Sequence, residues 1–102
     1  MFKDTIKVGT FHYSVIYPYL FQERTDLTGQ ADHDLCQIRI SQADGSGNIR
    51  VDSKIRETFL HELIHIADVI SGHEIFKGNE GAIEGISNIL FSILDENDLI
   101  KF

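Results

Sequence analysis

The spacing of apolar residues changes near Ser53, and this change limits the possible fold more than any other feature of the chain. Before it, β-branched and aromatic residues are frequent in IKVGTFHYSVIYPYLF (residues 6–21), and LCQIRIS (residues 35–41) alternates apolar with polar side chains. QADGSGN (residues 42–48) has the composition of a turn, after which IRV (residues 49–51) can return as a short strand. The first half therefore predicts a small antiparallel sheet.

After Ser53 the apolar residues recur at helical spacing. The pattern predicts a first helix from about Lys54 to Ser71, with Asp52 or Ser53 as its N-cap and Gly72 as the left-handed residue after its end. The apolar positions that define this helix are three or four residues apart: Ile55, Phe59, Leu63, Ile66 and Ile70.

A second helix is predicted to begin near Asn79 or Glu80 and to continue to about Asp95. Its expected apolar stripe consists of Ile83, Ile86, Leu90 and Leu94. The connection GHEIFKG (residues 72–78) is short, so the two helices are expected to be neighbours. The sequence thus predicts a single α+β domain over residues 1–102, with a sheet in residues 1–52 packed on two helices in residues 53–102.

Composition restricts the partners and the compartment. The 102 residues carry a net charge of −7 and contain no run of Lys or Arg, so nucleic acid and anionic membranes are not expected as partners. Cys36 is the only cysteine, which excludes an internal disulfide and is typical of a reducing compartment. The first ten residues lack the apolar stretch of a signal peptide, so the expected location is the cytoplasm.

The segment HELIH places His61, Glu62 and His65 in the order H-E-x-x-H on the first helix. Residues four apart lie on one face, about one turn apart, so both imidazoles can bind one ion. This spacing suits two ligands of a tetrahedral zinc ion. Glu62 projects beside that face, where it can act as a general base without binding the metal.

Zinc requires a third protein ligand, and the second helix offers two carboxylates at i and i+4, Glu80 and Glu84. Glu84 is preferred because apolar and small residues surround it, which indicates a face packed against the first helix; Glu80 is the alternative. Two further side chains, Asp68 and Asn88, are placed where they can hydrogen-bond a ligand histidine from behind.

These residues carry a family resemblance. HELIH followed by GAIEGISN (residues 81–88) resembles the gluzincin metallopeptidases, and the second segment is similar to the thermolysin pattern around the glutamate ligand. The order of strands, ETFLHELIHIAD (residues 57–68) and an acidic-apolar helix resembles still more the small phage and prophage HExxH proteins related to ImmA/IrrE-type metallopeptidases. The resemblance implies a minimal zincin-like core with zinc on His61, His65 and Glu84 and with Glu62 as base.

The chain also departs from the larger relatives that it resembles. Thermolysin-like enzymes use a further histidine and a second lobe, whereas this chain has no histidine after His73 and no second lobe. Metzincins carry a third histidine six positions after the second, where this chain has Ser71. The group that stabilises the developing oxyanion is therefore left open among Tyr13, Tyr17, Tyr19 and His73.

The expected function is zinc-dependent hydrolysis of peptide bonds in a protein substrate, with a metal-activated water and Glu62 as general base. An edge strand formed by DLCQIRIS (residues 34–41) is expected to bind the extended substrate by strand addition. The alternative is a non-catalytic module of phage or prophage origin, in which zinc stabilises a small domain that binds a protein partner. The sequence does not indicate the substrate or the oligomeric state.

Overall fold

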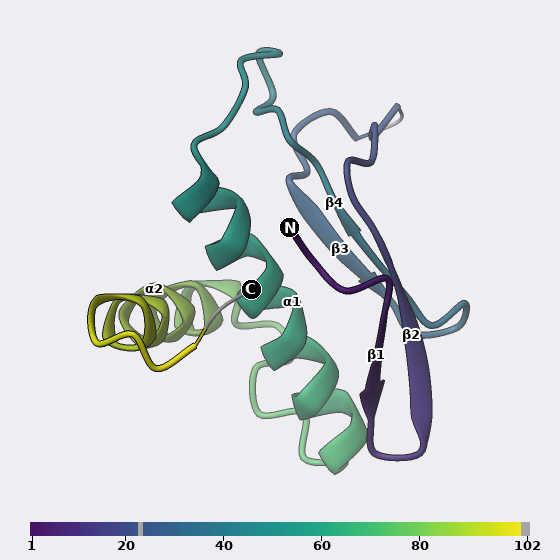
Figure 1. Ribbon diagram of the computed structural model, residues 1–102. Helices are drawn as coiled ribbons and strands as arrows, with labels where there is room; N and C mark the ends of the chain where they lie inside the picture. Colours follow the sequence, from purple (N-terminus) through teal and green to yellow (C-terminus); the bar gives the residue numbers. More distant parts are fainter. Residues whose placement is uncertain (23, 101–102) are drawn as a thin grey trace.

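The computed structural model describes residues 1–22 and 24–100, which form a four-stranded sheet followed by two helices. Figure 1 shows helix α1 (Asp52–Ser71) between the sheet on one side and helix α2 (Glu80–Glu96) on the other. The predicted α+β class is confirmed. Within the described residues, α2 packs on α1 and on no strand, so α1 alone covers the sheet. No helix in this part of the chain is long and apolar enough to cross a membrane.

The sheet is mixed and not antiparallel as predicted. It consists of β1 (Thr5–Val8), β2 (Phe11–Ile16), β3 (Gly29–Asp32) and β4 (Gln37–Ile40), in the spatial order β1-β2-β4-β3. The pairs β1–β2 and β3–β4 are antiparallel, whereas β2 and β4 pair in parallel. The parallel pair arises because the long connection after β2 returns the chain so that β4 is inserted between β2 and β3, an arrangement that period-two patterns do not encode.

The prediction that residues 34–41 form an edge strand is wrong. Residues 34–41 contain β4, which lies between two other strands and has its backbone groups paired on both sides. The edge on the side of β4 is instead the short strand β3. The predicted strand at residues 49–51 is also absent; within the described residues this stretch forms only an isolated bridge between Ala43 and Ile49.

Both helices begin and end close to the predicted residues. In α1 the N-cap is Val51, which makes no side-chain cap, and not Asp52 or Ser53. Its end is as predicted, because Gly72 adopts φ 81°, a left-handed conformation that glycine adopts without steric cost. In α2 the side chain of Asn79 caps the first turn by accepting a hydrogen bond from the Ala82 backbone N–H.

The buried face of α2 differs from the predicted stripe. The residues of α2 that are buried are Ile83, Ser87 and Phe91, whereas Ile86 is 49% exposed. The predicted stripe followed hydrophobicity, and α2 is apolar on more than the one face that α1 covers. The main core lies between α1 and the sheet, where six buried side chains meet: Tyr13, Ile38, Ile40, Ile55, Phe59 and Ile66.

Candidate metal centre

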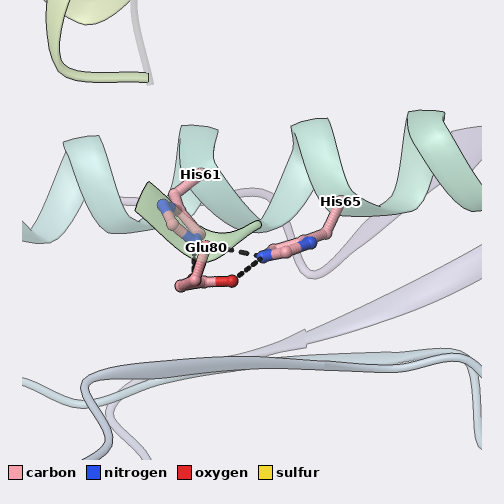
Figure 2. A group of neighbouring side chains, drawn as sticks. All are labelled: His61, His65 and Glu80. Carbon is pink, nitrogen blue, oxygen red and sulfur yellow. Dashed lines mark hydrogen bonds and ion pairs between the residues drawn. The ribbon is translucent and has the colours of Figure 1, made fainter. Parts of the chain in front are cut away.

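His61 and His65 lie one turn apart on the side of α1 that faces the start of α2, and both direct an imidazole nitrogen at the same point (Figure 2). The two Nε2 atoms are 3.1 Å apart. Two nitrogens bound to one tetrahedral zinc at the usual 2.0–2.1 Å are about 3.3 Å apart, so the observed separation fits two ligands of a single ion. The spacing of four residues on a helix produces this geometry, as the sequence predicted.

Glu80, the first residue of α2, supplies the carboxylate at this point. Its Oε1 is 2.7 Å from His61 Nε2, and its Oε2 is 3.3 Å from His65 Nε2. Figure 2 shows the carboxylate facing both imidazoles. The three potential ligand atoms lie within 4.8 Å of one another, and one carboxylate with two imidazoles is a common donor set for zinc.

The structure therefore brings Glu80 to the histidines and leaves Glu84, the preferred ligand of the sequence interpretation, outside the cluster. Glu84 is exposed and lines the adjacent pocket. Helix geometry explains the difference: at 3.6 residues per turn, Glu80 lies only about 20° around α2 from the buried Ser87, whereas Glu84 lies about 60° from it. The apolar neighbours suggested a buried Glu84, but only Ile83 is buried and Ile86 is exposed.

Ser87 supports His61 from behind. Ser87 is fully buried, and its hydroxyl group donates a hydrogen bond to the Glu84 carbonyl oxygen at 3.1 Å. The hydroxyl oxygen lies 3.3 Å from His61 Nδ1. With its proton directed at the carbonyl, the hydroxyl oxygen can accept a hydrogen bond from the Nδ1–H tautomer of His61. This tautomer leaves the lone pair of Nε2 free for a metal. In the sequence, the signal for this role of Ser87 is a serine at a helical position that lies between the apolar residues Ile83 and Phe91.

Asp68 and Asn88, which were expected to hydrogen-bond a ligand histidine, do not contact His61 or His65 in this way within the described residues. Both carboxylate oxygens of Asp68 accept backbone hydrogen bonds from the connection between the helices, at 2.8 Å from Ile75 N and 3.0 Å from Phe76 N. Asn88 is exposed, and within residues 1–22 and 24–100 it makes no hydrogen bond to either histidine. Asp68 thus fixes the loop that leads into Glu80, and Ser87 takes the position behind His61.

The carboxyl group of Glu62 lies close to Gly29 of β3, lines the same pocket as His61 and Glu80, and is only 7% exposed. Burial, aided by the nearby charge of Glu80, raises the pKa of Glu62 from its ordinary 4.5 to about 8, although a hydrogen bond from the Ala31 backbone opposes the shift. A positive ion at the histidines would also oppose it. A carboxyl group whose pKa lies near neutrality can both accept and return a proton at physiological pH.

A glycine in β3 makes room for this carboxyl group. A Cβ on Gly29 would lie 2.5 Å from Thr58 Cγ2 and 3.0 Å from Glu62 Oε2. Real side chains do not approach so closely, so α1 and β3 can pack at this distance only because residue 29 has no side chain. Gly29 was not identified from the sequence, because a lone glycine at the start of a strand is also a common turn residue.

A pocket of about 230 Å³ opens beside the cluster and includes Glu62 among its lining residues. His61, Glu80 and Glu84 contribute to its wall, together with Gly29 and the backbone around it, and Arg50 and Lys54 also line it. The edge strand β3, the histidine face of α1 and the first turn of α2 therefore enclose one cavity.

The four groups considered for oxyanion stabilisation do not line this pocket. Tyr13 is buried in the main core, where its hydroxyl is 3.2 Å from His33 Nδ1. Tyr17 packs edge-on against Phe2, and Tyr19 stacks near Phe21. His73 is exposed just after Gly72.

Comparison of the sequence with models of known protein families found no matching family, and comparisons with curated proteins and with solved structures found no match either. The metallopeptidase interpretation therefore rests on the HELIH motif and on the geometry of the residues around it.

Proposed function

We propose that this protein is a zinc-dependent metallopeptidase of the HExxH type, with His61, His65 and Glu80 as metal ligands and Glu62 as general base. One observation carries the proposal: two imidazole nitrogens and a carboxylate converge on a point beside a pocket that a buried glutamate lines. Buried carboxylates are rare in proteins unless they are paired or perform chemistry. Neither the convergence nor the burial of Glu62 is needed for an ordinary amphipathic helix.

The residues of the chain have separate tasks in this mechanism. When bound, zinc polarises the carbonyl group of the substrate and lowers the pKa of water. Glu62 removes a proton from the attacking water and delivers it to the nitrogen of the leaving group. Its burial against β3 holds the carboxyl group in place and excludes bulk water. Ser87 keeps His61 in the tautomer that leaves Nε2 free.

The proposed substrate is an extended peptide or a flexible segment of a protein. The edge strand β3 borders the pocket and adjoins Glu62, so an added strand would run past the general base. The proposed site of strand addition is therefore β3 and not residues 34–41, because β4 lies inside the sheet. The proposed location is the cytoplasm, which the single cysteine supports. The resemblance to small phage and prophage proteins stays part of this proposal.

A second candidate function is a non-catalytic module in which zinc joins the two helices. The packing of α2 favours it, because within the described residues α2 contacts α1 and no strand. An ion shared by His61, His65 and Glu80 would therefore fix the orientation of α2 and of any partner bound to it.

Zinc-loaded protein incubated with a peptide library and with denatured proteins separates the two functions. If the protein is a peptidase, the wild type should cleave and Glu62→Gln should not, although both proteins contain the same amount of zinc. Cleavage that persists in Glu62→Gln contradicts the assigned base. If neither protein cleaves any substrate and chelation abolishes folding, the structural role of zinc is favoured.

A further inference from the structure

Arg50 lies just before α1 and lines the same pocket as Glu62. Its side chain is half-buried, and its guanidinium group donates hydrogen bonds to three uncharged oxygens. These are the backbone oxygen of Ser41 at 3.3 Å, the backbone oxygen of Lys54 at 3.1 Å and the hydroxyl of Thr58. The guanidinium group is thus held in one orientation by neutral groups.

The charge of Arg50 has no carboxylate in contact within residues 1–22 and 24–100. Two acidic residues that line the pocket are paired with other cations, Asp26 with Arg24 and Glu57 with Lys54. Burial lowers the pKa of Arg50, while Glu57 and Asp44 oppose this at longer range. A guanidinium group has five N–H donors, and two of those of Arg50 have no acceptor among the described residues. Partly buried charges normally have a partner of opposite charge, so an anion would complete this site.

Arg50 lies at a defined position relative to Glu62. Its partner Thr58 is four residues before Glu62, which is about 6 Å along the helix axis. Thr58 and Glu62 both lie against position 29 of β3, where a Cβ would be 2.5 Å from Thr58 Cγ2 and 3.0 Å from Glu62 Oε2. An extended chain advances about 3.3–3.6 Å per residue, so a group bound at Arg50 lies about two residues along a peptide from Glu62.

We propose that Arg50, with Lys54 beside it in the pocket, binds a carboxylate of the substrate about two residues from the bond that is cleaved. The carboxylate can be the C-terminus of a peptide or the side chain of Asp or Glu. Its role in substrate selection rests on the proposed peptidase function. Binding of the carboxylate itself needs no metal and can be measured separately.

The test uses four N-acetylated tetrapeptides and metal-free protein labelled for NMR. The first ends in a free carboxylate and the second is its amide; the third and fourth are amides that end in Glu and in Gln. The amide signal of Thr58 and the Nε–H signal of Arg50 report on binding. At least one carboxylate peptide should bind about tenfold more tightly than its neutral counterpart and shift both signals. The first pair tests the C-terminus, and the second tests the side chain.

Variants localise the effect. Arg50→Gln should remove the preference for the carboxylate peptide, Arg50→Lys should retain part of it, and Lys54→Gln should weaken it. Lys77→Gln, a change at an exposed cation outside this pocket, should leave it unchanged. Because Lys54 is also exposed, its variant keeps the test valid if Arg50→Gln does not fold. Equal binding of charged and neutral peptides, or a preference that survives Arg50→Gln in a folded protein, would overturn the proposal.

The outcomes separate this inference from the proposed function. Carboxylate preference without zinc binding or cleavage would contradict the peptidase and leave the anion site at Arg50 established. Cleavage by the zinc-loaded wild type without any carboxylate preference would overturn the anion site alone.

Discussion

The hydroxyl oxygen of Ser87 lies 3.3 Å from Nδ1 of His61, on the side of the imidazole ring opposite to the candidate metal position. This contact joins the two helices, and in the tautomer that donates from Nδ1 to Ser87 the Nε2 of His61 is available to a metal. Ser87 is completely buried, so no water can replace its hydroxyl without rearrangement of the helix packing.

Ser87→Ala is expected to weaken zinc binding by about 10- to 100-fold, the usual effect of removing a group that orients a ligand histidine. A competition titration against a chromogenic chelator measures the change. Ser92→Ala, a half-buried serine on the same helix, is the matched control and should bind zinc like the wild type. Equal affinity in Ser87→Ala would show that the hydroxyl does not orient His61.

The stability of the metal-free protein should depend on the protonation of Glu62. With a folded pKa of about 8 and an ordinary value of 4.5, the folded chain keeps a proton across this range that the unfolded chain releases. The stabilisation is complete below pH 4.5 and is lost as the pH rises through 8. Because Gln cannot ionise, Glu62→Gln should become more stable than the wild type with rising pH, by roughly a few kcal/mol at about 1.4 kcal/mol per pKa unit.

Urea unfolding of both proteins in a chelator at pH 5, 7 and 9 measures this difference. A stability difference that stays constant from pH 5 to pH 9 would contradict the raised pKa of Glu62.

Gly29→Ala should destabilise the protein, because the new methyl group would lie 2.5 Å from Thr58 Cγ2. A cost of about 1–3 kcal/mol is typical of such overpacking. Thr58→Ser removes the opposing methyl group and keeps the hydroxyl that binds Arg50, so it should restore part of the stability in the double variant. Thermal unfolding of the two single variants and the double variant gives the coupling free energy.

Gly85→Ala is the control for this series. A Cβ at Gly85 meets no atom within 4 Å, and alanine is favoured over glycine inside a helix by about 1 kcal/mol. This variant should be slightly more stable than the wild type. If Gly29→Ala were equally harmless, the close packing of β3 on Glu62 would be refuted.

Local patterns predicted the helices well, because periodicity and caps are encoded within a few neighbouring residues. The bounds of α1 and α2, the left-handed Gly72 and the convergence of His61 and His65 all follow from such patterns. The parallel pairing of β2 with β4 did not follow, since it depends on how the chain returns after a long connection.

The third side chain of the candidate metal cluster could not be identified from local patterns alone. Glu80 and Glu84 both lie near His61. Which of the two carboxylates reaches the histidines depends on the rotation of α2 about its own axis relative to α1. That rotation is fixed by the buried Ile83, Ser87 and Phe91. The hydrophobic pattern correctly indicated Ile83, but it continued the stripe through Ile86, which is exposed. Gly29, Ser87 and Arg50 gain their roles only from contacts between segments distant in sequence.

The central claim is tested most directly by the zinc content of untagged protein, measured by elemental mass spectrometry for the wild type, Glu80→Ala and Glu84→Ala. The geometry predicts one zinc per chain in the wild type and in Glu84→Ala, with loss or strong weakening in Glu80→Ala. The two variants remove equivalent side chains one turn apart on the same helix, so each is the control for the other. Zinc that is retained in Glu80→Ala and lost in Glu84→Ala, or a wild type that binds no zinc, would contradict this account.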